Sequence, residues 1–295
     1  MKRILLPALV VLAAFALARG AAADTPFPAV HSGDVFVIAQ TVTTDGSMHD
    51  YYKPGDTVVF RAYAVDGKNH KILTEAKYFY ATIPGQPNVK FKYDPKAKTA
   101  LGQYAWIGTW TVPSTYQLGL VNFKVLVQAK TKRRGSFVQM PVPTSQLTIT
   151  NTPPPTGTTP PGASSTPTGT DNTVVYADSV NGTRPAGAAP RPIGCTQTNV
   201  FKRGEQFVLR TWGFDLTTKT VFSLDNVTEA HFTVPGLPNN VVLNWGSHGA
   251  AKVFFWSNFW NIPTAYPLGD VTVKITYTLT TGKAATLDYP ITIIP

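Results

Sequence analysis

The 295-residue chain has a single cysteine, Cys195, and charged residues make up only 14% of it. One cysteine cannot form an intrachain disulfide, so each folded unit must be stabilised by its own core. The low charge does not fit a nucleic-acid-binding protein, whose basic residues gather on one face, and we expect no nucleic-acid partner. No window has the apolar period of a helix. With 25 prolines, 23 glycines and 12% aromatic residues, the composition favours an all-β protein.

Residues for catalysis are also scarce. The 16 carboxylates lie mostly in turn contexts such as Gly55-Asp56, so no pair indicates general acid–base chemistry. The sequence contains no Gly-x-Ser-x-Gly elbow, zinc signature, phosphate loop or haem-attachment motif. We therefore predict no enzyme and no cofactor. A small enzyme or a metal chaperone that binds copper through His31 is an alternative, but it requires a second ligand that the sequence does not show.

The first residues indicate export. Lys2 and Arg3 precede an apolar run over residues 4–17, and the small residues 21–23 follow it. This order is typical of a signal peptide, predicted over residues 1–23, and the apolar run is too short for a membrane span. The remaining chain shows no other anchoring signal. We expect a periplasmic, cell-surface or extracellular protein without a transmembrane anchor.

The rest of the chain repeats itself after about 150 residues, and what recurs is typical of a scaffold. Two modules are predicted, over residues 24–150 and 173–295. The matching segments are WTVPSTYQLG (110–119) and WNIPTAYPLG (260–269), YKPGD (52–56) and FKRGE (201–205), and IPGQP (83–87) and VPGLP (234–238).

A segment rich in Pro, Thr and Gly, residues 151–172, separates the modules. It has no apolar residue able to anchor a core, and its prolines favour extended geometry. We predict a semi-rigid spacer that holds the modules apart and sets their reach. A second loose stretch, residues 181–194, is expected to be a long loop.

Within each module the apolar residues alternate. Val121, Phe123 and Val125 face one way, and the pattern recurs at Val271 and Val273. A period of two is typical of half-buried strands. Short strands separated by Pro and Gly predict two antiparallel sheets packed as a sandwich in each module.

The segments 110–119 and 260–269 carry a tryptophan, an apolar-proline corner, a tyrosine and a glycine that opens the next strand. They resemble bacterial immunoglobulin-like and fibronectin type III-like repeats. The resemblance implies that this corner carries the chain from one sheet to the other. It also implies that the tyrosine hydroxyl hydrogen-bonds to nearby backbone. The cysteine pair of antibody domains is missing, so the resemblance implies architecture and not a binding mode.

Aromatic residues are the candidates for a binding site. Trp110 and Trp260 are expected in the cores. Trp106 and Trp256 are core residues as well, unless a bulge at Gly108 turns the outer tryptophan toward solvent.

In the second module Phe255 and Phe259 are expected on the opposite face of the strand, where the first module has Ala105 and Thr109. An outward aromatic pair can stack on a sugar ring, pack on a partner or meet the other module.

Two basic features have a structural and a functional interpretation. Arg61 and Arg210 occupy matching positions, and we interpret them as structural arginines that are stacked or ion-paired on the outer sheet. The run over residues 130–134, KTKRR, is interpreted as a solvated hairpin tip, with a site for an anionic partner as the alternative.

The sequence therefore predicts an exported, non-enzymatic structural or adhesive protein that binds another protein or a cell-envelope component. The alternative is a carbohydrate-binding accessory module that uses Trp106, Trp256, Phe255 and Phe259 and binds a polysaccharide. It requires those rings to be exposed and coplanar. Exposed sheet edges would also permit oligomer or filament assembly by strand addition.

Overall fold

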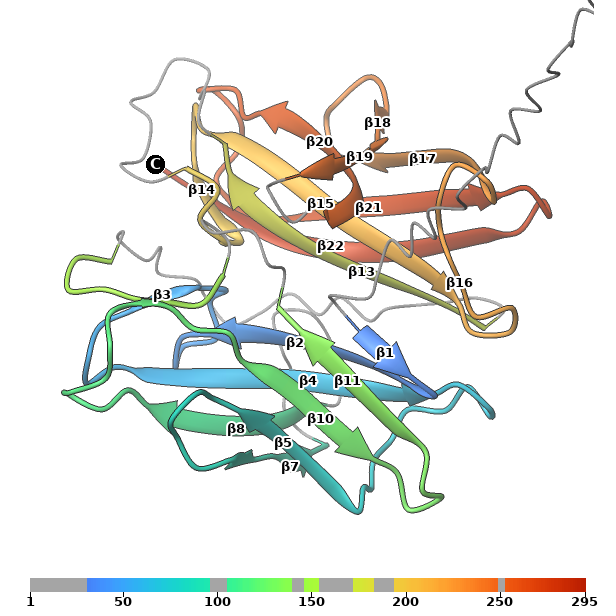
Figure 1. The fold of residues 1–295 in the computed structure, drawn as a ribbon. Helices are drawn as coiled ribbons and strands as arrows, with labels where there is room; N and C mark the ends of the chain where they lie inside the picture. The colour runs from blue at the N-terminus through green and yellow to red at the C-terminus, as the bar shows by residue number, and fades with distance from the viewer. Residues whose placement is uncertain (1–30, 96–104, 140–145, 154–171, 183–193, 249–252) are drawn as a thin grey trace, which may run out of the picture.

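The computed structural model contains strands and no α-helix in the part of the chain that it describes (Figure 1). None of these residues belongs to a helix that could cross a membrane. The predicted signal peptide, most of the spacer and most of the loop 181–194 lie outside the described residues. The described ranges are 31–95, 105–139, 146–153, 172–182, 194–248 and 253–295.

The first sandwich consists of two main sheets, which we call 1A and 1B, and one small sheet. Sheet 1A has the order β1 (His31–Gly33), β11 (Arg134–Val138), β10 (Lys124–Gln128), β5 (Tyr78–Thr82), β6 (Val89–Lys90). Sheet 1B has the order β2 (Val35–Val42), β4 (Thr57–Asp66), β8 (Ala105–Thr111), β7 (Lys92–Asp94). The small sheet joins β3 (Tyr51–Tyr52), β12 (Thr148–Ile149) and β9 (Gly119–Leu120).

The second sandwich repeats this plan with sheets 2A and 2B. Sheet 2A has the order β14 (Val200–Lys202), β22 (Ala284–Ile294), β21 (Gly269–Leu279), β17 (Val227–Thr233), β18 (Val241–Val242). Sheet 2B has the order β13 (Thr173–Asn181), β15 (Gln206–Asp215), β20 (Val253–Asn261), β19 (Asn244–His248), and β16 (Thr220–Val221) pairs with β15.

The main strands of the two sandwiches correspond, and the antiparallel sheets confirm the predicted all-β fold. The pair β4 and β8 corresponds to β15 and β20, and the pair β5 and β10 corresponds to β17 and β21. One long strand, β22, stands where the first sandwich has β11 and then β12. Two short pairings are parallel, β3 with β12 and β14 with β22.

The repeated corner behaves as expected in both sandwiches. The Tyr116 hydroxyl donates to the carbonyl of Pro84 at 3.1 Å, and its ring packs on buried Trp110 with centroids 5.0 Å apart. In the second sandwich the Tyr266 hydroxyl donates at 2.7 Å to the equivalent proline carbonyl, and its ring lies 4.8 Å from Trp260. The tyrosine thus ties each corner to backbone while it covers the core tryptophan.

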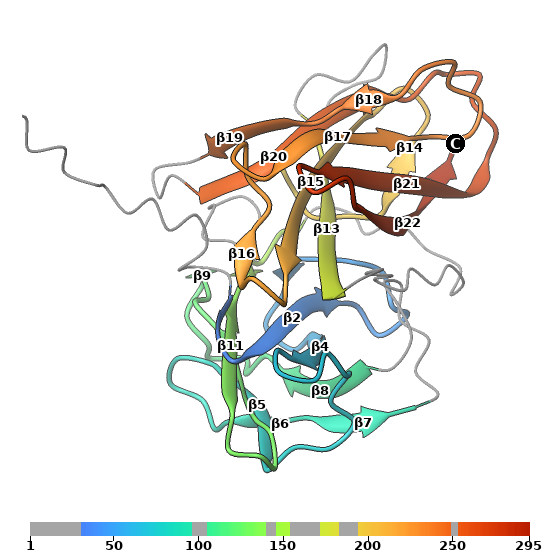
Figure 2. The ribbon, with the colours of Figure 1, turned by 90° about the vertical axis from the view of Figure 1, so that its right-hand side faces the viewer.

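The sandwiches pack against each other, contrary to the expectation that the spacer holds them apart. Figures 1 and 2 both place the β13 and β16 side of the second sandwich against the β2 side of the first. Every described side chain of β2 and of β13 is buried, although each strand is at the end of its sheet. Alternate residues of a strand face opposite sides, so one side lies in its own core and the other in the contact between sandwiches.

Candidate functional site

The structure buries both tryptophans that were candidates for a sugar platform. Trp106 is 7% exposed and Trp256 is 4% exposed. The Nε1–H of Trp106 donates to the carbonyl of Leu73 at 2.7 Å, and that of Trp256 donates to the carbonyl of Phe222 at 2.8 Å. Both rings are therefore core residues with satisfied hydrogen bonds, and the outward orientation is wrong.

Gly108 does not mark a bulge. The pairing of β4 with β8 runs without a break from Thr57 opposite Thr111 to Ala62 opposite Trp106, so every second residue of β8 keeps its side. A Cβ at Gly108 would lie 2.3 Å from Cδ1 of Phe91. The glycine is required because the Phe91 ring occupies that space.

The two phenylalanines, Phe255 and Phe259, lie in different environments. Phe259 is 50% exposed, whereas Phe255 is 5% exposed and packs on Trp212 with ring centroids 5.7 Å apart. Phe255 and Trp212 belong to a buried cluster that also includes Phe36 of the first sandwich. Phe255 is therefore not outward, and it belongs to a buried cluster to which both modules contribute. The four predicted residues do not form an exposed platform.

A polar cluster lies buried where the sandwiches meet. Its members are Asp50 of the first sandwich and Asp178, Gln197 and Arg210 of the second, each at most 4% exposed. Arg210 Nε lies 2.6 Å from Asp178 Oδ1. The Gln197 backbone N–H lies 3.2 Å from each carboxylate oxygen of Asp50, and its side-chain amide donates to Asp178 at 3.2 Å. Gln197 thus connects the carboxylates of the two modules.

Burial dominates the electrostatics of this cluster. It raises the pKa of the Asp50 carboxyl well above its usual range. Burial also raises the pKa of Asp178, although Arg210 opposes the shift by favouring the charged form. These groups are closed off from solvent, so the cluster does not present a reactive group. Its role is to connect the two modules through Gln197 and Asp50.

Further contacts across the same boundary are specific. The Met48 backbone N–H donates to Asn199 Oδ1 at 3.2 Å, and the Tyr289 hydroxyl contacts Met48 Sδ at 3.3 Å. The Phe36 and Phe214 rings stack with centroids 5.3 Å apart. The sequence did contain a signal for this contact. Residues 35–42 and 173–181 lack the polar alternation of an exposed strand, and both runs are buried.

The matched arginines differ in their partners. The interpretation of Arg210 as an ion-paired residue is confirmed, with Asp178 as the partner. Arg61 is half-buried in the first sandwich. Asp66, five residues after Arg61 in the sequence, pairs with Arg133. The repeat therefore preserves the position of the arginine but not its interaction.

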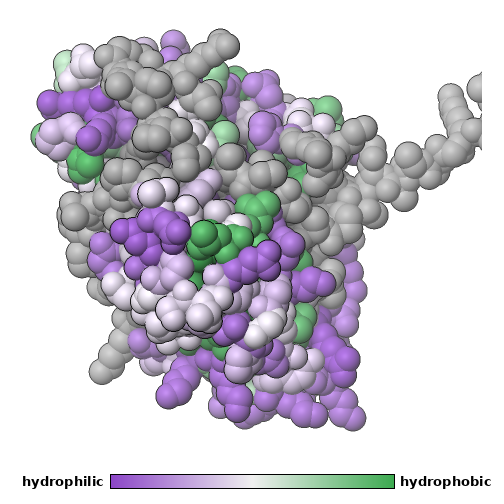
Figure 3. Space-filling view, turned by 60° about the vertical axis from the view of Figure 1, so that its left-hand side comes forward, coloured by the Kyte–Doolittle hydropathy of each residue, from purple (hydrophilic) through white to green (hydrophobic). Residues whose placement is uncertain are grey.

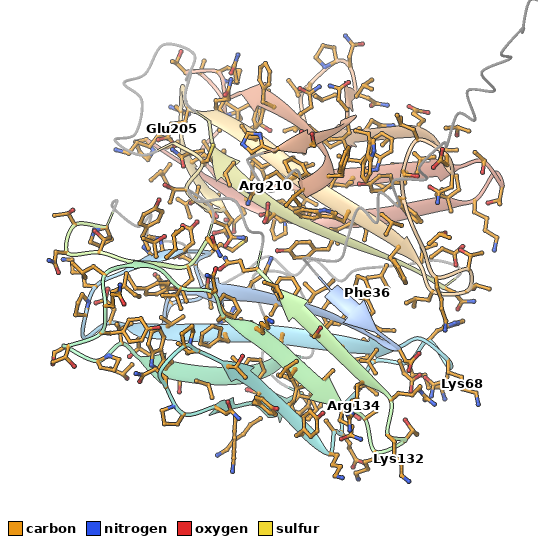
Figure 4. All side chains as sticks on the ribbon, in the orientation of Figure 1. Phe36, Lys68, Lys132, Arg134, Glu205 and Arg210 are labelled. Carbon is orange, nitrogen blue, oxygen red and sulfur yellow. The ribbon has the colours of Figure 1, made fainter. Side chains whose placement is uncertain are left out.

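The basic run does form a hairpin tip, between β10 and β11. Lys130 pairs with Glu75 at 2.5 Å, and both side chains are exposed. Lys132 and Arg134 are exposed and lie near Lys68 at one corner of the first sandwich (Figure 4). This corner is the basic end of sheet 1A.

The outward face of sheet 1A combines aromatic and basic residues. In Figure 1, β10 and β11 pass in front of β4, so this face is turned toward the viewer. Tyr78 and Tyr80 are both partly exposed, with ring centroids 5.3 Å apart. Lys90 is the cross-strand neighbour of Tyr80, and Lys124 and Arg134 point outward from β10 and β11. Sequence reasoning missed the tyrosines, although their alternation with Phe79 and Ala81 predicts an outward face.

Other exposed apolar residues are scattered. On the side viewed in Figure 3, hydrophobic surface forms small areas among hydrophilic and intermediate residues. The most exposed large apolar residues in the described ranges include Leu224, Val242 and Phe259.

The residues considered for metal or thiol chemistry give no assembled site. In the described ranges, no group of three or more His, Cys, Asp or Glu residues could hold a metal ion. The side chain of His31 lies outside the described residues, so the copper alternative stays a prediction. Cys195 is partly exposed in a turn, where its N–H donates to the Asn181 carbonyl at 2.7 Å.

No family model and no curated protein matches the chain. Among solved structures, the chain is similar to the fibronectin(III)-like modules of Clostridium thermocellum CbhA, at 13% sequence identity. The match covers 87% of this chain and 93% of that chain, with a TM-score of 0.22. A score this low carries no argument about function, so the fold assignment rests on the strands and their pairing.

Proposed function

We propose that this chain is an exported, non-enzymatic binding protein in which two immunoglobulin-like sandwiches act as one rigid body. Its partner would be a protein or another component of the cell envelope, contacted in the periplasm, at the cell surface or outside the cell. The observation that supports this proposal most is the contact between the sandwiches, with its buried Asp50, Asp178 and Arg210.

A fixed contact favours binding for a physical reason. Association has an entropic cost when loosely connected parts must be ordered, and preorganised surfaces avoid that cost. Here the outward faces of sheets 1A and 2A are each exposed in part, and the two sandwiches pack together through β2 and β13. One partner could then engage a wide surface without ordering the modules first.

The rigid-body part of the proposal is tested by cutting the chain between the modules. A protease site placed within residues 154–171 should be cleaved without separating the halves, which should co-elute in size exclusion at neutral pH. Elution of two independent sandwiches would contradict the proposal.

The export and binding parts are tested in the producing organism. The exported fraction should contain protein that begins at Asp24, as measured by N-terminal sequencing. Purified mature protein should sediment with isolated cell envelopes and should remain in the supernatant without them. Retention in the cytoplasm, or no sedimentation with envelopes, would count against the proposed function.

A further inference from the structure

We propose that the outward face of sheet 1A is a binding surface for an anionic polysaccharide. This inference deepens the proposed function, on which it rests, by naming the chemistry of the partner. The surface consists of Tyr78, Tyr80, Lys90, Lys124 and Arg134. It is distinct from the four aromatic residues that the sequence suggested, of which only Phe259 is exposed.

The two tyrosines provide the apolar part of the surface. They are separated by one residue on β5, so they share a face, and their rings are inclined by 43°. Partial burial holds each ring in place while leaving part of it open. An aromatic ring with a polar hydroxyl suits a sugar, whose C–H groups pack on the electron-rich ring and whose hydroxyls form hydrogen bonds.

The basic residues extend across four neighbouring strands. Lys90 is on β6, Lys124 on β10 and Arg134 on β11, with the tyrosines on β5 between them. Strands lie about 4.8 Å apart, so the charges span roughly 14 Å. None of the outward strand positions of β5, β6, β10 and β11 is acidic. A repeating polyanion can meet several of these charges at once, whereas a small anion would meet one.

The second sandwich provides an internal comparison at the same register positions. Glu229 replaces Tyr78, His231 replaces Tyr80 and Val242 replaces Lys90. Ala284 stands in place of Arg134, and only Lys274 matches its counterpart, Lys124.

Because the two scaffolds match, core packing does not account for this difference between the faces. The charge of the whole modules differs in the same direction. Residues 24–150 have 14 Lys and Arg against 8 Asp and Glu, whereas residues 173–295 have 9 against 7. The binding surface is therefore assigned to the first sandwich alone.

The test measures binding of the mature two-module protein to alginate, a uronate polymer, by isothermal titration calorimetry at low salt. Dextran serves as a neutral polysaccharide, and polyglutamate and single-stranded DNA serve as polyanions of other classes. Alginate should bind, dextran should not, and the two other polyanions should bind at least tenfold more weakly than alginate. Affinity for alginate should fall as salt is added, because the charges are exposed.

Matched variants locate the site. Tyr80→Ser should weaken alginate binding about tenfold, the scale of losing one aromatic stacking contact. Lys124→Ala should weaken it about two- to fivefold, as expected for one exposed charge. The counterpart variants His231→Ser and Lys274→Ala should leave it within about twofold, because neither residue belongs to the proposed surface. Thermal midpoints identify any variant that fails to fold.

Several results would overturn the inference. They are absence of alginate binding, polyglutamate or DNA binding as tight as alginate, or equal losses from the variants of both sandwiches. The envelope sedimentation assay separates this inference from the proposed function. Envelope binding without alginate binding would remove only the polysaccharide surface, whereas absence of envelope binding would remove the proposed function, even if alginate binds.

Discussion

Replacing Arg210 by methionine tests whether the buried cluster holds the molecule together. The guanidinium lies 2.6 Å from Asp178, and the two side chains are 5% and 3% exposed. The variant would leave Asp178 and Asp50 buried without their cation. Removing one partner of a buried pair costs about 3–5 kcal/mol, against a typical free energy of unfolding of about 5–15 kcal/mol. We therefore expect a large fall in stability at pH 7.

The loss should depend on pH with a definite sign. Without Arg210, the pKa of Asp178 rises further, because the nearby positive charge that favoured the carboxylate is gone. The native state then binds a proton that the unfolded state lacks at neutral pH. The loss of unfolding free energy in the variant, relative to wild type, should therefore become smaller as pH falls from 7 toward 4.

Urea unfolding followed by tryptophan fluorescence measures this effect, at pH 7 and at pH 5. The double variant Arg210→Met/Asp178→Leu should recover most of the stability, since a buried pair can be replaced by apolar residues at little cost. Arg61→Met is the matched control and should cost less, because Arg61 is only half-buried. Two results would refute the assigned role. One is a loss of unfolding free energy below about 1 kcal/mol at pH 7, the scale of a surface ion pair. The other is a loss that grows as pH falls.

Two further predictions concern buried positions. Gly213→Ala should destabilise the second sandwich by about 1–3 kcal/mol or more, because its Cβ would lie 1.7 Å from Cδ2 of buried Phe222. Gly246→Ala, where a Cβ would meet nothing within 4 Å, should change the unfolding free energy by less than about 0.5 kcal/mol, and equal effects on thermal midpoints would contradict this account. Burial raises the pKa of Asp50 in the folded state, so its contribution to stability is present at low pH and is lost as pH rises through that pKa. Asp50→Asn keeps an acceptor for Gln197 but removes the titration. In urea titrations, the stability of this variant relative to wild type should therefore be greater at pH 8 than at pH 4. An unchanged pH profile would exclude this explanation.

The parts of the fold that depend on local pattern could be predicted from the sequence. Alternation placed Val125 and Val273 in strands with buried inward faces, and the repeated corner predicted the tyrosine-to-backbone bond that Tyr116 and Tyr266 make. These features follow from neighbours in the chain and from the period of a strand. The duplication strengthened each prediction, because one pattern had to fit both modules.

The features that depend on how the modules pack could not be obtained in this way. The buried outward side of β13 and the pairing of Arg210 with Asp178 both follow from module placement or strand pairing that the sequence does not state. The sequence alone could not decide between the core and the outward orientation of Trp106, because the Phe91 ring that fills the space at Gly108 is a tertiary contact. The outward position of Tyr78 and Tyr80, in contrast, follows from the alternation along β5 and was predictable from the sequence.

The covalent connection between the sandwiches has a consequence for crowded conditions. A tether of this kind keeps the two contact faces at an effective concentration on the order of millimolar. At lower protein concentrations each β2 side therefore meets the β13 side of its own chain. At protein concentrations above this effective concentration, the first sandwich of one chain would also bind the second sandwich of a neighbouring chain. Exchange of sandwiches would then link the copies through the same buried surface, without any new interface.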